Sequence, residues 1–203
     1  MKHIFNPSKA AGRPTLLLLH GTGGNELDLL PLAGIIDDQA AVLSVRGNVL
    51  ENGMPRFFRR LEEGIFDEED LVNRTKELND FLDEAAVEYD FDRDNIIAIG
   101  YSNGANIAAS LLFHYQNALK GAVLHHPMVP LRGKELPDLT GKHVFIAAGI
   151  NDPLCPPEES EELQQLLEQA HAFVGMYWGD RGHQLTNAEV DAAASWYTDK
   201  IVK

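Results

Sequence analysis

Residues 95–109 read Asn-Ile-Ile-Ala-Ile-Gly-Tyr-Ser-Asn-Gly-Ala-Asn-Ile-Ala-Ala. The apolar run at the start of this segment predicts a buried β-strand, and the alanine-rich run at its end predicts a helix. Between them lies the pattern G-x-S-x-G, in which two glycines leave room for a sharp turn from strand to helix. In this context the Ser102 hydroxyl lies exposed at the tip of the turn. The alternative interpretation is a glycine-flanked turn with a capping serine.

Predicted strands and helices alternate on both sides of this segment. Short apolar runs predict strands at Thr15–Leu19, Ala41–Val45, Asn95–Ile99, Gly121–Leu124, His143–Ala148 and Ala172–Tyr177. Helical spacing of apolar residues predicts helices at Glu26–Ile36, Glu68–Tyr89, Asn103–Phe113, Glu158–Gln169 and Asn187–Lys200. This alternation indicates an α/β protein with a mostly parallel central sheet and helices on both faces. We expect residues 1–203 to form a single domain.

The composition limits the partners and the location of the protein. There are 17 lysines and arginines against 31 aspartates and glutamates, so the formal net charge is −14. A negative field of this size repels nucleic acid and anionic membranes, and we expect neither as a partner. The apolar runs fall short of the ~18–20 residues that span a bilayer, and the N-terminus lacks a signal-peptide core. With Cys155 as the only cysteine, we expect no disulfide and a cytoplasmic protein.

In parallel sheets, ligands bind beyond the carboxyl ends of the strands. The strand at Thr15–Leu19 is followed by His-Gly-Thr-Gly-Gly at 20–24, whose glycines let backbone N–H groups approach a ligand closely. The N–H groups of Thr22 and Asn103 would together form an oxyanion hole. A phosphate-binding loop is the competing interpretation, but neither G-x-x-x-x-G-K-[ST] nor G-x-G-x-x-G is matched. We expect His20 to be a structural residue behind this loop.

Two further strand ends carry an acid and a base. Asp152 follows the strand at 143–148 in a turn fixed by Pro153, and His183 lies between a glycine and a predicted helix. An isolated aspartate before a proline is usually a loop carboxylate. The chain order Ser102, Asp152, His183 is, however, the order of nucleophile, acid and histidine in one large class of serine hydrolases. This order favours the catalytic interpretation.

Two other features leave alternatives open. The adjacent His125 and His126 suggest a metal site, but no third ligand has suitable spacing, so we expect pocket-lining residues and no metal. The region Arg46–Phe66 shows no clear periodicity, and a loop of this length is usually functional or mobile. Its arginines at 56, 59 and 60 would meet either an anionic substrate or salt-bridge partners on this acidic chain.

The chain resembles small α/β-hydrolases without a cap domain, in the carboxylesterase/phospholipase branch that includes acyl-protein thioesterases. The resemblance extends from Leu16 to about Tyr197. It is carried by Leu-His-Gly-Thr-Gly-Gly-Asn-Glu at 19–26, Gly-Tyr-Ser-Asn-Gly-Ala-Asn at 100–106, Gly-Ile-Asn-Asp-Pro at 149–153 and Gly-His at 182–183. Relatives often have Gly-Phe-Ser-Gln-Gly around the serine, and a small Ser-Gly pair where this chain has His125-His126.

The resemblance implies an esterase that needs no cofactor and works through an acyl-enzyme. Ser102 would be the nucleophile, Asp152 the acid and His183 the base, with the N–H groups of Thr22 and Asn103 as oxyanion donors. We expect the pocket to be lined by Met54, Phe57, Phe58, His126, Met128 and Leu154, with core packing as the alternative for both phenylalanines. The expected partner is a small-molecule ester with a small or medium acyl or aromatic group. A thioesterase, a lysophospholipase, a non-catalytic binding protein and a homodimer stay open.

Overall fold

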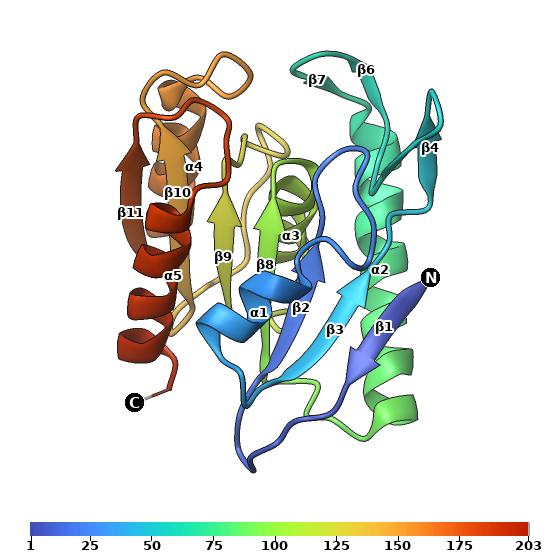
Figure 1. The fold of residues 1–203 in the computed structure, drawn as a ribbon. Coiled ribbons are helices and arrows are strands. Elements are labelled where there is room, and N and C mark those ends of the chain that lie inside the picture. The colour runs from blue at the N-terminus through green and yellow to red at the C-terminus, as the bar shows by residue number, and fades with distance from the viewer. Residues whose placement is uncertain (203) are drawn as a thin grey trace.

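Strands and helices alternate along the chain in the computed structural model, which describes residues 1–202 (Figure 1). The strands are β1 (His3–Asn6), β2 (Thr15–Leu19), β3 (Ala41–Val45), β4 (Val49–Glu51), β5 (Met54–Arg56), β6 (Arg60–Glu62), β7 (Ile65–Phe66), β8 (Ile96–Tyr101), β9 (Gly121–His125), β10 (His143–Gly149) and β11 (Phe173–Gly179). The helices are α1 (Leu30–Ile36), α2 (Glu68–Tyr89), α3 (Asn103–His114), α4 (Pro157–Gln169) and α5 (Asn187–Lys200).

Seven of the strands form one sheet in the order β1-β3-β2-β8-β9-β10-β11. All neighbouring strands are parallel except β1 and β3, so the predicted mostly parallel sheet is confirmed. The sheet grows in opposite directions from β2 and β8, which makes the border between these two strands a topological switch point. Leu19 pairs with Gly100 across this border. The loops that follow β2 and β8 therefore flank the crevice where ligands bind in such sheets.

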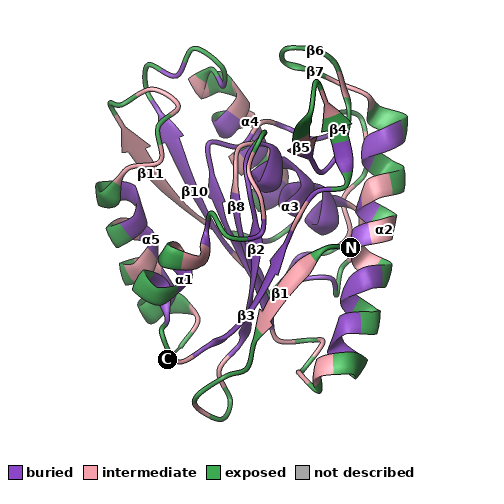
Figure 2. Cartoon of the chain, turned by 45° about the vertical axis from the view of Figure 1, so that its right-hand side comes forward, coloured by how far each residue is buried: buried purple, intermediate pink, exposed green. Residues whose placement is uncertain are grey.

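Helices cover both faces of the sheet (Figure 1), and each face has its own hydrophobic cluster. Residues of α2, α3 and α4 pack on one face, and residues of α1 and α5 pack on the other. The central strands are buried except for Tyr101 at the end of β8 and His143 at the start of β10, whereas the edge strands β1 and β11 are mostly only partly buried (Figure 2). No helix within residues 1–202 combines the length and the apolar character that crossing a membrane requires.

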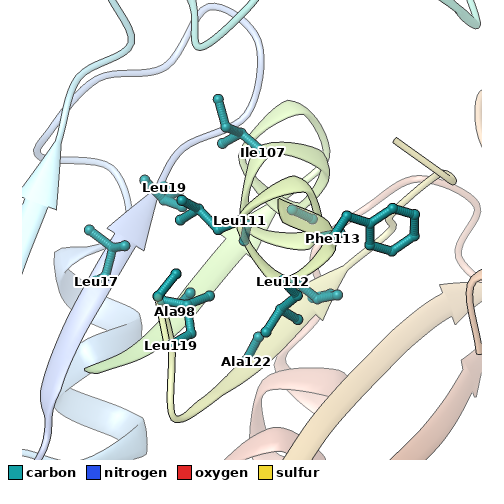
Figure 3. Packing of buried hydrophobic residues seen from close by; sticks show 14 of the residues in the cluster. Leu17, Leu19, Ala98, Ile107, Leu111, Leu112, Phe113, Leu119 and Ala122 are labelled. Atoms are coloured by element: carbon teal, nitrogen blue, oxygen red, sulfur yellow. The ribbon is translucent and has the colours of Figure 1, made fainter. Parts of the chain in front are cut away.

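Helix α3 is the best-packed support of the site, because every residue from Asn103 to Phe113 is buried. Figure 3 shows Ile107, Leu111 and Leu112 of this helix against Leu19 and Ala98 of the sheet. Burying one such large aliphatic side chain stabilises the fold by roughly 1.5–3 kcal/mol. The packing therefore fixes the N-terminus of α3 relative to the ends of β2 and β8.

The structure differs from the sequence-based expectation in a few places. Strand β1 was not predicted, and α1 begins at Leu30 rather than at Glu26 because the residues between form turns. The region 46–66 contains two hairpins, β4–β5 and β6–β7, in place of the expected irregular loop. The first hairpin turns at Asn52-Gly53, where both residues have positive φ. Asn-Gly is the preferred sequence for such a turn, so the signal was present.

Candidate active site

Ser102, His183 and Asp152 form one hydrogen-bonded chain at the carboxyl end of the sheet. The Oγ atom of Ser102, which follows β8, lies 2.9 Å from Nε2 of His183. Nδ1 of His183 lies 2.7 Å from Oδ2 of Asp152, which follows β10. The Asp152 side chain has no solvent exposure, and that of His183 is 18% exposed. The structure thus brings together three residues that the sequence analysis selected from separate loops.

The turn that carries Ser102 is strained. Its φ of 52° and ψ of −114° lie in a region that non-glycine residues rarely adopt. A Cβ atom at Gly104 would lie 1.9 Å from the Leu19 carbonyl oxygen, and one at Gly100 would lie 2.5 Å from the Gly104 carbonyl oxygen. Both flanking glycines are therefore required by close backbone contacts. The backbone N–H of Ser102 donates to the His125 carbonyl at 2.8 Å, which holds the turn against the end of β9.

Thr22 and Asn103 line the same pocket as Ser102. Asn103 is the first residue of α3, where a helix leaves its N–H groups without intrahelical acceptors. The Thr22 hydroxyl accepts a hydrogen bond from Nη1 of the buried Arg56 at 2.6 Å. Behind the loop, Nδ1 of His20 donates to the Gly21 carbonyl at 2.6 Å. His20 thus lies in the structural position expected for it.

The loops of Asp152 and His183 are fastened to each other and to β8. The Asp152 carboxylate also accepts the backbone N–H groups of Leu154 at 2.9 Å and Cys155 at 3.0 Å. Burial alone would raise the pKa of Asp152, but the hydrogen bonds from His183 and these amides lower it below its usual value. The Tyr101 hydroxyl donates to the His183 carbonyl at 2.7 Å. Tyr101 therefore helps to hold His183, a role that the sequence analysis missed.

The pocket beside Ser102 has a volume of about 300 Å³. Of the expected lining residues, His126, Met128 and Leu154 lie on its wall, together with Phe66, which was not expected. Phe57 and Phe58 do not line it, because both rings are 1% exposed or less and pack in the core. Met54 is not a lining residue either, since its 39% exposed side chain lies near Gly23. These three positions correct the predicted lining.

The arginines of the 46–66 region have salt-bridge partners. Arg56 and Arg60 both contact Glu51, with N–O distances of 3.2 and 2.9 Å. Arg59 lies away from the pocket and contacts Asp67 at 2.9 Å. Both Arg56 and Arg60 nevertheless belong to the pocket wall. The guanidinium of Arg56 links the first hairpin to the Thr22 loop.

A buried carboxylate that the sequence analysis did not select lies behind the site. Glu189 is 2% exposed, and its Oε1 and Oε2 atoms lie 2.9 Å from Nδ1 of His125 and 3.3 Å from Nε2 of His126. Glu189 is the third residue of α5, after the N-cap Thr186. The pattern T-x-x-E would have predicted a capping box there. It could not have predicted a glutamate side chain directed at two histidines more than 60 residues away.

Three side chains of the site lie close enough together to hold a metal ion. The ligating atoms of His126, Asp152 and His183 all lie within 4.8 Å of one another, which is compact enough for a metal ion. The same atoms already form histidine–carboxylate hydrogen bonds, so a metal would have to replace these bonds.

The Cys155 thiol is buried and donates to the Pro127 carbonyl at 2.7 Å. Burial raises its pKa to about 12, which leaves no reactive thiolate.

Comparisons with known proteins agree with this geometry. The chain is 62% identical over 202 residues to MhqD of Bacillus subtilis (strain 168), which is named as a hydrolase, with both chains fully covered. The crystal structure of a Bacillus cereus carboxylesterase superimposes with a TM-score of 0.98 at 73% identity, over 99% of this chain and 95% of that one. A Mesorhizobium loti carboxylesterase gives a TM-score of 0.87 at 30% identity, over 92% and 89%. Residues 2–197 match the phospholipase/carboxylesterase model. The chain therefore belongs to the phospholipase/carboxylesterase family of α/β-hydrolases.

Proposed function

We propose that the protein hydrolyses carboxylic esters with small or medium acyl or aromatic groups, through an acyl-enzyme formed on Ser102. The observation that carries this proposal is the hydrogen-bonded chain Ser102–His183–Asp152 at 2.9 and 2.7 Å, with the serine in a strained turn at the pocket. A capping serine would accept hydrogen bonds from the first turn of its helix, but the Ser102 side chain makes no capping bond to α3.

In the proposed mechanism, His183 first acts as a general base. Its Nε2 takes the proton of Ser102 Oγ as this oxygen attacks the ester carbonyl carbon. Asp152 stabilises the imidazolium that forms and holds Nδ1 in its protonated state. The same proton then goes to the leaving alcohol as the acyl–oxygen bond breaks. Water, deprotonated by His183, attacks the acyl-enzyme in the second half, and the acid and free Ser102 are released.

The charge that develops on the carbonyl oxygen would be bound by backbone N–H groups of Thr22 and Asn103. Both residues border the pocket next to Ser102. The loss of one such donor in other enzymes lowers kcat by about 10²–10³-fold, so each loop has a large share in the rate. Arg56 would support this function indirectly, because its guanidinium holds the Thr22 side chain at 2.6 Å.

The pocket supports small substrates. A volume of about 300 Å³ is at the lower end of ligand sites, which span ~300–1,000 Å³. The hairpins beside the pocket carry exposed apolar side chains, including Leu61 at 72% and Ile65 at 48% exposure. These features favour apolar acyl or aromatic groups of modest size. A thioesterase or a lysophospholipase would use the same triad, but the long acyl chain of a lysophospholipid would exceed this volume.

The central test combines turnover with active-site labelling. The wild-type protein should hydrolyse p-nitrophenyl butyrate and react with a fluorophosphonate probe at one serine. Ser102→Ala should abolish labelling and lower kcat by about 10⁴-fold or more, with an unchanged circular dichroism spectrum. Ser195→Ala, at an exposed serine on α5, is the matched control and should retain both activities. Turnover retained by Ser102→Ala would reject the serine mechanism.

A second measurement separates the remaining alternatives. Ester and thioester substrates with acyl chains from acetyl to palmitoyl would be compared by kcat/KM. We expect the highest values for short acyl or aromatic esters, whereas a maximum at palmitoyl would support a lysophospholipase. Labelling of Ser102 without steady-state turnover of any substrate would support the non-catalytic binding protein instead.

A further inference from the structure

Asp152 has a second imidazole partner besides His183. Its Oδ2 atom lies 2.7 Å from Nδ1 of His183 and 3.0 Å from Nδ1 of His126. Because its Oδ1 atom accepts two backbone amides, four N–H groups converge on this one buried carboxylate. A serine–histidine–aspartate chain requires only one of the two histidines. The function of the other therefore needs a separate explanation.

Both ring nitrogens of His126 face a carboxylate. Nδ1 contacts Asp152, and Nε2 lies 3.3 Å from Oε2 of Glu189. Ionised carboxylates only accept hydrogen bonds, so a ring that bonds to one at each nitrogen carries a proton on both. Burial alone would lower the pKa of His126, but the hydrogen bonds and charges of Glu189 and Asp152 raise it above its usual value. The two contacts and the raised pKa therefore both favour the doubly protonated form of His126, which is 2% exposed and lies between two carboxylates.

Several other groups face His126 or its two carboxylate partners. The rings of Tyr101 and His183 lie 6.0 and 5.0 Å from its ring, centroid to centroid. Burial raises the pKa of Tyr101, so its hydroxyl is neutral. On the far side, Glu189 contacts His125 and the Thr186 hydroxyl. Cys155, whose amide binds Asp152, is a neutral buried thiol. Among these groups, His126 is the one whose two ring nitrogens contact both Asp152 and Glu189.

The backbone is shaped to hold the His126 ring in this place. Its φ is 54°, a left-handed conformation that is strained for a residue with a side chain. Its N–H donates to the Ala147 carbonyl of β10 at 2.7 Å, close to the strand end that leads to Asp152. Glu189 departs from the usual geometry as well. In a capping box its side chain would reach back to the N-cap amide, whereas here it contacts the histidines.

We infer that His126 is a positioning residue for the triad: as a buried imidazolium between Asp152 and Glu189, it fixes the Asp152 carboxylate and offsets part of its charge. This inference rests on the proposed function. An Asp152 whose charge is partly offset stabilises the protonated form of His183 less strongly. The enzyme then remains active further into the acidic range. A histidine that only packed the loops would have no such effect.

The test is the pH profile of kcat/KM for p-nitrophenyl butyrate in wild type and His126→Gln. Glutamine keeps an N–H donor and cannot carry a charge. We expect the midpoint of the acid limb to move up by about one pH unit, so that kcat/KM falls about tenfold near pH 6 and much less near pH 8.5. Because His126 also lines the pocket, a change in KM alone would not distinguish the two roles.

His125→Gln is the matched control. His125 is buried at the end of the same strand and contacts Glu189, while the contacts of Asp152 do not involve it. Its acid limb should stay within about 0.2 pH unit of the wild-type position. An unchanged midpoint in folded His126→Gln, or an equal shift in both variants, would overturn the inference.

A direct measurement on the wild-type protein covers the case in which His126→Gln does not fold. Nitrogen-15 spectra of the histidine rings should show the His126 ring protonated on both nitrogens at pH 8, well above the ~6.5 of an ordinary histidine. A neutral ring there would contradict the inference. Since this measurement needs no turnover, it is independent of the proposed function. If the wild-type protein did not hydrolyse esters, the proposed function would be refuted, but the measured protonation state of His126 would not change.

Discussion

Replacing Glu189 with glutamine removes one negative charge from a buried cluster and leaves the shape of the side chain almost unchanged. Burial alone would raise the pKa of this carboxyl, but the hydrogen bonds from His125 and His126 together with the charges of these histidines lower it from 4.5 to about 2. Because one pKa unit corresponds to about 1.4 kcal/mol, ionised Glu189 contributes about 3 kcal/mol to the free energy of unfolding at neutral pH. We expect the free energy of unfolding of Glu189→Gln at neutral pH to be lower than that of wild type by about this amount.

The sign of the pH dependence follows from the direction of the shift. A pKa that is lower in the folded state gives a contribution that is complete well above pH 4.5 and lost as the pH falls toward 2. Wild type should therefore lose about 1.5 kcal/mol of this contribution by pH 3.5, whereas Glu189→Gln has none to lose. The difference between the two proteins should shrink from about 3.4 to about 2 kcal/mol as the pH is lowered.

Urea unfolding at pH 7 and pH 3.5, followed by circular dichroism, measures both free energies. Glu161→Gln, at an exposed position on α4, is the control and should stay within about 0.5 kcal/mol of wild type. A Glu189→Gln variant as stable as wild type at pH 7 would refute the reasoning. So would a difference that is equal at both pH values, because it would show that the charge of Glu189 is not the source of its effect.

Two further predictions concern groups at the edge of the site. Tyr101→Phe removes the hydroxyl that donates to the His183 carbonyl at 2.7 Å. We therefore expect thermal unfolding to show a free energy of unfolding lower by about 1 kcal/mol, and kcat to be several-fold lower. An unchanged kcat would show that the bond does not position His183. Cys155 should not react with a disulfide reagent at pH 8 in the native state, since burial raises its pKa to about 12, and should react fully in urea. Rapid native labelling would contradict this.

The sequence predicted the parts of this protein that are determined locally. The alternation of apolar runs and helical segments depends only on residues that are close in the sequence. It predicted the six parallel strands and the helices that cover them. The same pattern predicted that the residues directly after these strands lie close together, because parallel strands end at one edge of the sheet. The G-x-S-x-G motif predicted the sharp turn at Ser102, since the close backbone contacts at Gly100 and Gly104 exclude any side chain.

The features that escaped prediction depend on contacts between distant segments. Phe57 and Phe58 are apolar residues near the active-site loops, and only the packing of the first hairpin decides that they enter the core. Strand β1 pairs with β3 about 40 residues away, and its short sequence carries no strong strand signal. Glu189 stands in a T-x-x-E capping pattern that gives no sign of its partners, which lie more than 60 residues earlier in the chain. No local pattern records such contacts.

The buried cluster behind Ser102, His183 and Asp152 is better explained by the proposed chemistry than by stability. Well-packed apolar residues in place of a buried ion pair often give an equally or more stable protein, so the pairing of Glu189 with His125 and His126 is weak evidence that the fold requires it. The left-handed backbone of His126 adds strain of roughly 1–3 kcal/mol. Both features become understandable if the imidazolium beside Asp152 serves the reaction. In that case the carboxylate of Glu189 stabilises the positive charge on the His126 ring. This charge acts on His183 through Asp152, which accepts a hydrogen bond from each of the two histidines.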